Sequence, residues 1–366
     1  MAIPPANGVS SGPRKLNIGV VGIGRMGQRH ALNILHRVPR ANLLCVCSPA
    51  KSDLEWADQH LKPYGVQIYA TFEEMIETPG LEAVVIASAT ALHTKHTIES
   101  LERGIHVLCE KPVTTDLDEL AMVLAKAESR PDVKVMVGFT RRFDDDYQYA
   151  RKKVEAGDIG TPIVIRSQGC ETLDKSGFFV QYAKVSGGIF VDTTIHDIDL
   201  TLSFFGDDIQ PKALWATGTA AMHKELEEFH DADNAVGVVE FWGGKIAYYY
   251  HSRTAVHGYD NVTEIYGTNG KLSINAVPRK NRVEISDVHG VRHEALPSWI
   301  DRYSGAFVTE LNEFTAAVLD NTELPMKLST ALTSLRIALA LQESLVTGKK
   351  IEFDEKGNRI TPEKAS

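Results

Sequence analysis

The sequence of 366 residues is short of cysteine and has no long apolar run. Its four cysteines, Cys45, Cys47, Cys109 and Cys170, match neither a disulfide framework nor the ligand spacing of a zinc site, so we expect core thiols and no metal. No stretch approaches the roughly 18 consecutive apolar residues of a membrane span. The sequence therefore predicts a globular protein without a membrane partner.

Positive charge is also scarce, since 39 Lys and Arg face 48 Asp and Glu and give a formal net charge of -9. Without a dense basic block, this balance argues against a nucleic-acid partner. The first 15 residues, MAIPPANGVSSGPRK, lack the apolar centre of a secretory signal, so we expect a flexible tail and a cytoplasmic location. The length and the 43% hydrophobic content indicate two domains with ample cores.

A strand, a glycine turn and a helix follow the tail. Leu16 to Val21 is a short run of mostly apolar residues, Gly22, Gly24 and Gly27 come next in G-x-G-x-x-G spacing, and Arg25 to Val38 has a helical pattern. The first glycine allows the turn, the second lets a pyrophosphate approach the backbone, and the third lets the helix pack on the strand. This context favours dinucleotide binding over a glycine turn without a ligand.

The end of the second predicted strand, Asn42 to Cys47, bears on the choice of cofactor. An acidic residue usually grips the ribose of NAD there, about 20 residues after the glycines, but this chain has Ser48. Arg25 and Lys51 could offer positive charge to a 2'-phosphate, which favours NADP. The alternative is that both side chains are solvated and that Ser48 accepts NAD.

Two further strand ends carry polar residues. The loop Ser88 to His93 follows the apolar run Leu81 to Ala87, so His93 either borders the cofactor or only begins the next helix. The strand Ile105 to Cys109 ends in Glu110-Lys111-Pro112. A Lys at this place could set an ammonium beside a nicotinamide and a substrate hydroxyl.

A carboxylate and an imidazole lie four residues apart in Ser186 to Leu200, SGGIFVDTTIHDIDL. If the stretch is helical, Asp192 and His196 share one face, while Ile189, Ile195, Ile198 and Leu202 form a buried stripe. The carboxylate could then orient the imidazole as an acid/base group. The alternative is a solvated surface pair, which is common at this spacing.

Taken together, the glycine turn, Glu110-Lys111-Pro112 and SGGIFVDTTIHDID resemble the glucose-fructose oxidoreductase, inositol dehydrogenase and rhizopine-catabolism (Gfo/Idh/MocA) family. VMVGFTRRF from Val135, TEIYGTNGKLSI from Thr263 and RYSGAFVTELNEF from Arg302 are similar to family segments as well. The resemblance implies an α/β protein: an N-terminal Rossmann domain and a C-terminal α+β domain on a large open, mainly antiparallel sheet, whose outer face packs on another subunit. It also implies that Lys111, Asp192 and His196 are catalytic, with Arg141 as a substrate contact.

The chain departs from the family where a polyol's hydroxyls would be read. Ser167 to Thr172 replaces the usual Arg or His with polar neighbours, and Phe307 replaces a frequent Tyr. These differences leave inositol itself open as the substrate. Glu171, Gln181 and Tyr182 are the candidate replacements, and each is equally compatible with an ordinary loop position.

We therefore predict an NAD(P)-dependent dehydrogenase that transfers a hydride between nicotinamide and a carbinol carbon of a sugar, a cyclitol or a related polyhydroxy compound. The alternatives are an aldose dehydrogenase acting at the anomeric carbon and a non-catalytic nucleotide-sensing protein of the same fold. We expect a homodimer or homotetramer through the C-terminal sheet. The expected domains are a tail (1–15), the Rossmann domain (16–140), the substrate and oligomerisation domain (141–346) and a C-terminal tail (347–366). The predicted cofactor-binding residues are Gly22, Ile23, Gly24, Arg25, Met26, Gly27, Ser48, Lys51, Ser88, Thr90, His93, Glu110 and Lys111, and the predicted substrate-binding residues are Lys111, Arg141, Glu171, Tyr182, Asp192 and His196.

Overall fold

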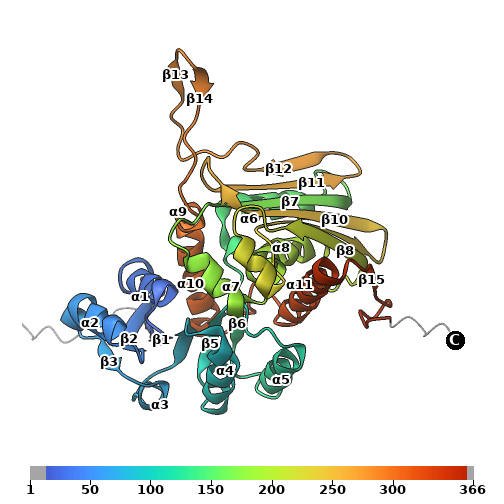
Figure 1. Ribbon diagram of the computed structural model, residues 1–366. Coiled ribbons are helices and arrows are strands. Elements are labelled where there is room, and N and C mark those ends of the chain that lie inside the picture. The colour runs from blue at the N-terminus through green and yellow to red at the C-terminus, as the bar shows by residue number, and fades with distance from the viewer. Residues whose placement is uncertain (1–13, 361–366) are drawn as a thin grey trace, which may run out of the picture. The chain divides into compact units, whose positions relative to one another are not determined.

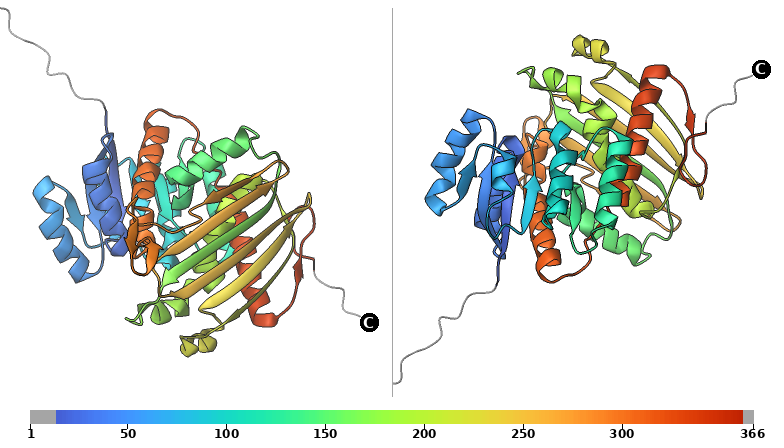
Figure 2. Two further views of the ribbon diagram at one scale, coloured as in Figure 1. Left: turned by 90° about the horizontal axis from the view of Figure 1, so that it is seen from above. Right: turned by 90° about the horizontal axis from the view of Figure 1, so that it is seen from below.

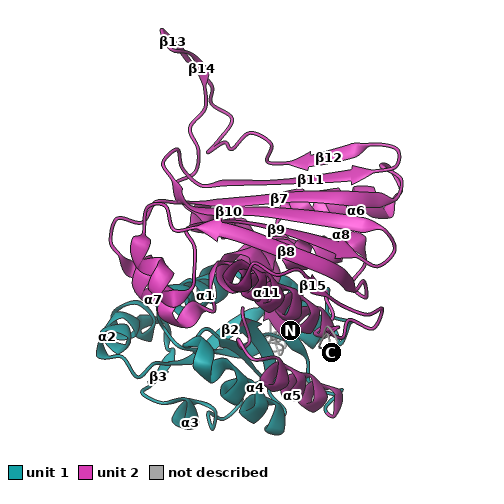
Figure 3. Ribbon diagram, turned by 45° about the vertical axis from the view of Figure 1, so that its right-hand side comes forward, with its two compact units in different colours: residues 1–109, 130–135, 311–325 teal, residues 110–129, 136–310, 326–366 magenta. Residues whose placement is uncertain are grey.

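The computed structural model describes residues 14–360, which form two compact units (Figures 1 and 3). One unit comprises the residues up to 109 together with 130–135 and 311–325. The other comprises 110–129, 136–310 and the residues from 326 onward, so the segment after Cys109 already belongs to it. Most of the tail expected at the N-terminus lies outside the described residues.

A six-stranded sheet organises the N-terminal half, in the order β3-β2-β1-β4-β5-β6. The pairs β1–β2, β1–β4, β2–β3 and β4–β5 are parallel. Their apolar runs are nearly continuous because both faces of such a sheet are covered, and all four residues of β4 are buried. The strands are β1 (Leu16–Val21), β2 (Ala41–Cys47), β3 (Gln67–Tyr69), β4 (Ala83–Ile86), β5 (His106–Glu110) and β6 (Val135–Gly138).

Helices alternate with these strands along the chain, as a Rossmann fold requires. The longer helices are α1 (Arg25–Arg37), α2 (Lys51–His60), α4 (His93–Glu102) and α5 (Leu117–Glu128). The side chain of Asp116 caps α5 by accepting hydrogen bonds from two backbone N–H groups of its first turn. Short turns are η1 (Lys62–Tyr64), α3 (Phe72–Met75) and η2 (Thr90–Leu92).

A seven-stranded sheet dominates the second unit, in the order β12-β11-β7-β10-β9-β8-β15 (Figure 2). Every neighbouring pair is antiparallel except β7 and β10, which run parallel. This confirms the predicted open, mainly antiparallel sheet. The strands are β7 (Pro162–Thr172), β8 (Pro211–Thr219), β9 (Asn234–Phe241), β10 (Lys245–Ala255), β11 (Asp260–Gly267), β12 (Lys271–Ile274) and β15 (Ile351–Glu352).

The two faces of this sheet differ in their surroundings. α8 (Ile195–Phe205) contacts β7 and β10, and α11 (Ser329–Thr347) contacts β8. Tyr249 is fully buried and donates a hydrogen bond to Thr201 of α8, whereas Tyr248 and Tyr250 remain exposed. The alternation along β10 therefore separates a covered face from an open one.

The remaining elements of the second half are shorter or lie at its margins. A hairpin of β13 (Ile285–Asp287) and β14 (Gly290–Arg292) projects from the second unit (Figure 1). The other helices are η3 (Thr140–Phe143), α6 (Asp145–Glu155), α7 (Phe178–Ser186), the π-helix η4 (Phe190–Thr194), η5 (Lys224–Phe229), α9 (Trp299–Arg302) and α10 (Ser304–Leu319). Among residues 14–360, no helix is both long and apolar enough to cross a membrane.

Two segments differ from the sequence predictions. The polar composition of the stretch 222–233 predicts a loop, but Lys224–Phe229 forms a 3₁₀-helix anchored by the buried Leu226. The segment after residue 346 was expected to be a surface tail, yet Ile351 pairs with β8 and is buried, as is Phe353. In both cases one or two apolar residues are enough to fix a largely charged segment.

Candidate active site

The glycine turn after β1 leaves room for a phosphate. Gly22 has φ +87, and a Cβ on Gly27 would lie 1.7 Å from the Gly22 carbonyl oxygen, so neither position tolerates a side chain. Gly24 is the N-cap of α1, no side chain caps this helix, and a Cβ on Gly24 would meet no heavy atom within 4 Å. An open, uncapped helix N-terminus behind a tight turn fits the pyrophosphate of a dinucleotide.

The surroundings of Ser48 differ from the expectation. Its hydroxyl donates a hydrogen bond to Oδ2 of Asp53 at 2.7 Å, so a carboxylate does lie at the end of β2, supplied by the first turn of α2. Lys51 is almost fully exposed and pairs with Glu55 at 3.6 Å. The premise that this place lacks a carboxylate was therefore wrong, because Asp53 reaches back from five residues downstream.

The loop after β4 is held by two histidines. His93 is the first residue of α4, and its Nε2 lies 2.9 Å from the Ser88 carbonyl oxygen. The Ser88 hydroxyl is hydrogen-bonded to Nδ1 of His96 at 3.1 Å. Burial lowers the pKa of His96 to about 4, so its ring is neutral at neutral pH and can accept that hydrogen bond. Both histidines thus fix the loop that contains Ser88 and Thr90.

Lys111 and Asp192 are brought together within the second unit. The Lys111 ammonium donates a hydrogen bond to the Asp192 backbone carbonyl at 2.7 Å and lies 3.5 Å from carboxylate Oδ1. Both side chains are largely buried, with exposed fractions of 17% and 12%. Burial alone would raise the pKa of Asp192, but Arg253 and Lys111 lower it below its usual value. Asp192 is therefore an anionic acceptor.

The helical stretch that carries Asp192 and His196 confirms part of the prediction. Ile189, Ile195, Ile198 and Leu202 are buried as a stripe. However, Phe190–Thr194 is a π-helix, and α8 begins only at Ile195. A wider turn at this point changes the angular offset between positions 192 and 196, and π-turns often occur at functional sites.

His196 is not hydrogen-bonded to Asp192, contrary to the expectation. None of the described residues forms a hydrogen bond with its ring, and its Nδ1 is buried. Burial first, and then the charges of Lys111 and Arg141, lower the pKa of His196 well below its usual value. The imidazole is consequently neutral near pH 7 and available to a proton donor. The Asp192 carboxylate points instead toward cations, which explains why the expected pair does not form.

Sequence reasoning missed Arg253 on β10. Its Nη2 donates to Asp192 Oδ2 at 2.5 Å, and its Nη1 donates to Glu171 Oε2 at 3.1 Å. The guanidinium lies over the ring of Phe179, 3.9 Å from its centroid. Arg253 is separated from Asp192 by 61 positions, so no local spacing could have found it.

Arg141 belongs to a separate buried ion pair. Its Nη1 lies 2.8 Å from Asp197 Oδ1, and its Nη2 donates a long hydrogen bond of 3.4 Å to the Tyr259 hydroxyl. Asp197 also accepts from the Ser167 hydroxyl and is hydrogen-bonded to Nε2 of His251 at 2.8 Å. With 6% of its surface exposed, Arg141 is matched in charge by Asp197 of α8, and its Nη1 has no hydrogen-bond partner among the described residues.

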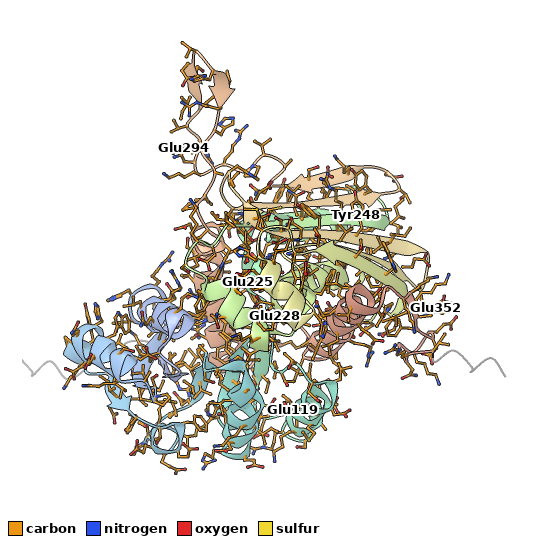
Figure 4. All side chains as sticks on the ribbon, in the orientation of Figure 1. Glu119, Glu225, Glu228, Tyr248, Glu294 and Glu352 are labelled. Atoms are coloured by element: carbon orange, nitrogen blue, oxygen red, sulfur yellow. The ribbon has the colours of Figure 1, made fainter. Side chains whose placement is uncertain are left out.

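The remaining candidates lie at the end of β7 and on α7. Glu171 contacts Arg253 directly, and Tyr182 stacks on Phe178 with ring centroids 6.1 Å apart. Gln181 lines a pocket of about 520 Å³ between α7 and η5, together with Lys175, Lys184, Glu225 and Glu228. Figure 4 labels the two glutamates, which lie on η5. Across the described part of the chain, no group of three His, Cys, Asp or Glu side chains could hold a metal ion.

Comparison with known proteins places these features in one family. Residues 16–139 match the family described as "Oxidoreductase family, NAD-binding Rossmann fold", and residues 147–273 match the "GFO/IDH/MocA C-terminal domain". The chain belongs to the Gfo/Idh/MocA family of oxidoreductases. It is a dehydrogenase with the expected α/β fold and a nicotinamide dinucleotide cofactor.

Relatives of this family are similar over nearly their whole length. The chain is 31% identical to the scyllo-inositol 2-dehydrogenase (NAD(+)) of Bacillus subtilis, covering 93% of this chain and 97% of that protein. It is 30% identical to the myo-inositol 2-dehydrogenase of Thermotoga maritima, with 93% and 99% covered. A crystal structure of scyllo-inositol dehydrogenase from Lactobacillus casei with bound NAD(H) and scyllo-inositol matches with a TM-score of 0.88 at 31% identity, covering 93% and 99%.

Proposed function

We propose that this protein oxidises a secondary hydroxyl of an uncharged cyclitol of the inositol type, with NAD as the cofactor. The observation that carries the proposal is the neutral imidazole of His196, whose Nδ1 has no hydrogen-bond partner among the described residues. His196 follows Asp192 on one helical stretch, and Asp192 forms an ion pair with Lys111. A base and a cation are the two groups that removal of a hydroxyl proton requires. The inositol dehydrogenases among the relatives support the substrate class.

Each of the three residues has a distinct role in this proposal. Neutral His196 takes the hydroxyl proton, and the Lys111 ammonium stabilises the negative charge that develops on the oxygen. Asp192 holds Lys111 through its backbone carbonyl and carboxylate and offers an acceptor to a neighbouring hydroxyl. When bound, NAD supplies the acceptor for the hydride. The hydride takes both electrons of the C–H bond with it, and the substrate carbon becomes a carbonyl carbon.

We assign the dinucleotide to the glycine turn and the strand ends of the N-terminal unit. The uncapped N-terminus of α1 receives the pyrophosphate, and the loop fixed by His93 and His96 lies at the carboxyl end of β4, where open α/β sheets bind ligands. The proposed cofactor-binding residues remain Gly22, Ile23, Gly24, Arg25, Met26, Gly27, Ser48, Lys51, Ser88, Thr90, His93, Glu110 and Lys111.

The sequence favours NADP, but the hydrogen bond between Ser48 and Asp53 supports NAD. A carboxylate at this strand end can accept a ribose hydroxyl and repels a 2'-phosphate. Lys51 extends into solvent beside Glu55, so its charge is partly balanced. We therefore propose Asp53 as the residue that selects NAD.

The charge balance supports an uncharged substrate. Lys111 and Arg253 face the carboxylates of Asp192 and Glu171, so these four groups sum to zero. Arg141, which the resemblance implied as a substrate contact, is matched by Asp197. An anionic sugar phosphate or uronate would have to break one of these pairs, whereas a polyol can bind by hydrogen bonds to Lys111, Asp192, His196 and Glu171. In this proposal Arg141 acts only through its ion pair with Asp197, and Tyr182 of α7 remains a candidate substrate contact.

We also propose that the protein is a homodimer or homotetramer through the open face of the seven-stranded sheet. That face carries exposed large apolar side chains from four strands, namely Trp215, Val236, Ile246, Tyr248, Tyr250 and Tyr266. A second copy would cover this apolar surface, which is uncommon on a monomer.

Reduction of NAD, followed as absorbance near 340 nm, tests the proposed function. We expect turnover with myo-inositol or scyllo-inositol, and at least tenfold lower kcat/KM with an inositol monophosphate. A panel of aldoses tests the alternative, oxidation at the anomeric carbon. Preference for an aldose over every cyclitol would overturn the proposed substrate class, and preference for the phosphate would overturn the argument from charge balance.

A further inference from the structure

Arg253 is the side chain that fixes the outer oxygen of the Asp192 carboxylate. Lys111 lies near Oδ1 and hydrogen-bonds the backbone carbonyl, and Arg253 takes Oδ2 at 2.5 Å. The carboxylate is thus held from two sides by two cations, Lys111 directly after β5 and Arg253 on β10. A planar guanidinium defines the direction of the carboxylate it binds more tightly than an ammonium can.

The guanidinium of Arg253 is itself held in place. Glu171 accepts from Nη1 at 3.1 Å, and the ring of Phe179 lies beneath the guanidinium. The backbone N–H of Arg253 donates to the Asp233 carbonyl at 2.8 Å, which fixes the main chain at the same residue. Only 7% of the side chain is exposed. The position of Arg253 is therefore determined by β7, α7, the residue before β9 and the end of β10 together.

We propose that Arg253, braced by Glu171 and Phe179, is a positioning residue that sets the orientation of Asp192 and, through it, the position of the Lys111 ammonium. This inference rests on the proposed function, in which Lys111 and Asp192 act on the substrate hydroxyls. Arg253 acts only through Asp192, so its contribution is to keep the reacting groups aligned. Misplacement of such groups by about 1 Å lowers turnover by roughly 10²-fold.

The charged groups around Asp192 determine the pH dependence. Arg253 and Lys111 face its carboxylate directly, and both lower its pKa. Glu171 and Asp231 act on Arg253 from the other side. His196, on the next turn, has a pKa lowered by burial and by Lys111. Removal of the Arg253 charge should therefore raise the pKa of Asp192, and activity should then be lost at a higher pH as the solution is acidified.

Three substitutions separate positioning from mere stabilisation. Arg253→Met removes the positive charge and both Nη donors. Arg253→Lys keeps the charge but makes a single contact. Glu171→Gln removes the carboxylate charge that holds Arg253 while retaining the size of the side chain. Arg142→Met is the matched control because Arg142 is equally buried and binds Asp199 and Asp207 in the same unit. Thermal unfolding and the Kd for NAD show whether each variant is folded.

We expect kcat for cyclitol oxidation to fall about 10²-fold in Arg253→Met with little change in the Kd for NAD, and the acid limb of its pH profile to move upward. The kcat of Arg253→Lys should be at least tenfold higher than that of Arg253→Met, and its acid limb should return toward that of the unsubstituted protein. Glu171→Gln should show a smaller loss of the same kind. Arg142→Met should lower the unfolding temperature without moving the acid limb.

Two outcomes would overturn the inference in a protein that oxidises cyclitols. One is a kcat and acid limb in Arg253→Met equal to those of the unsubstituted protein. The other is equal loss in Arg253→Met and Arg253→Lys with an unmoved pH profile, which would mean that Arg253 only stabilises the fold. If the unsubstituted protein oxidises no cyclitol, the proposed function fails first, so the two failures are distinguishable.

Discussion

The Lys111 ammonium donates a hydrogen bond of 2.7 Å to the backbone carbonyl of Asp192, and Oδ1 of the Asp192 carboxylate lies farther away, at 3.5 Å. The ammonium is thus tied to the main chain of the π-helix and to the carboxylate by two of its three N–H donors. The third donor can meet the oxygen of a substrate. This geometry explains how a cation in an ion pair can still serve the reaction.

Loss of either Lys111 or His196 should abolish most turnover. Lys111→Ala and His196→Ala are each expected to lower kcat by roughly 10²- to 10⁴-fold, because each removes a group that acts on the transferred proton or the charge it leaves. Cofactor binding, measured by NADH fluorescence, should persist. His289→Ala, in the exposed hairpin, is the control and should leave kcat unchanged. Near-normal turnover in either variant would contradict the assignment.

The pH profile should reveal the electrostatic coupling between Lys111 and His196. His196 has a lowered pKa, so it stays a neutral base below pH 6.5 and oxidation should continue there. Lys111→Met removes a cation that lowers the pKa of both His196 and Asp192, so both pKa values rise and the acid limb of residual activity moves to higher pH. Measurement of kcat/KM from pH 5 to 9 checks the direction. A limb that moves downward would show that another group controls it.

Cofactor choice should depend on Asp53. Asp53→Asn removes the carboxylate that repels a 2'-phosphate while keeping the hydrogen bond to Ser48 feasible. We expect the ratio of kcat/KM for NADP to that for NAD to rise at least tenfold, which corresponds to about 1.4 kcal/mol. Asp58→Asn, farther along α2 and paired with Lys62, is the control. A preference for NADP in the unsubstituted protein would show that the carboxylate does not decide the choice.

Assembly should depend on the open face of the sheet. Tyr248→Glu places a charge among the exposed apolar side chains and should shift the protein toward monomers in light scattering at micromolar concentration. Tyr149→Glu on α6 is the control, because Tyr149 is also exposed but lies outside this face. A monomeric unsubstituted protein, or two variants with equal masses, would contradict the proposed interface.

The sequence was sufficient for those features that depend on local spacing. The G-x-G-x-x-G turn, the buried strands and the stripe of Ile189, Ile195 and Ile198 all follow from residues close together in the chain. The family motifs likewise led to the fold and the reaction class, both of which the comparisons confirm.

Long-range pairing explains what the sequence did not reveal. A helical spacing of four predicts that Asp192 faces His196, but the π-helix changes that spacing and two cations capture the carboxylate. Arg253 arrives from β10 because the strand order of the sheet brings it there, which no periodicity encodes. Asp53 was overlooked for a simpler reason: the search for an acid ended at the strand, while the carboxylate came from the following helix.

The burial of all four cysteines has a practical consequence for labelling this protein. Burial raises the pKa of Cys45 to about 11 and those of Cys47 and Cys170 to about 12, so these thiols are not in the reactive thiolate form near pH 7, and Cys109 is fully buried as well. A cysteine introduced at Val288, at the exposed tip of the hairpin, would then be the preferred target of a maleimide dye. The native chain thus serves as its own unlabelled background for fluorescence experiments on the hairpin.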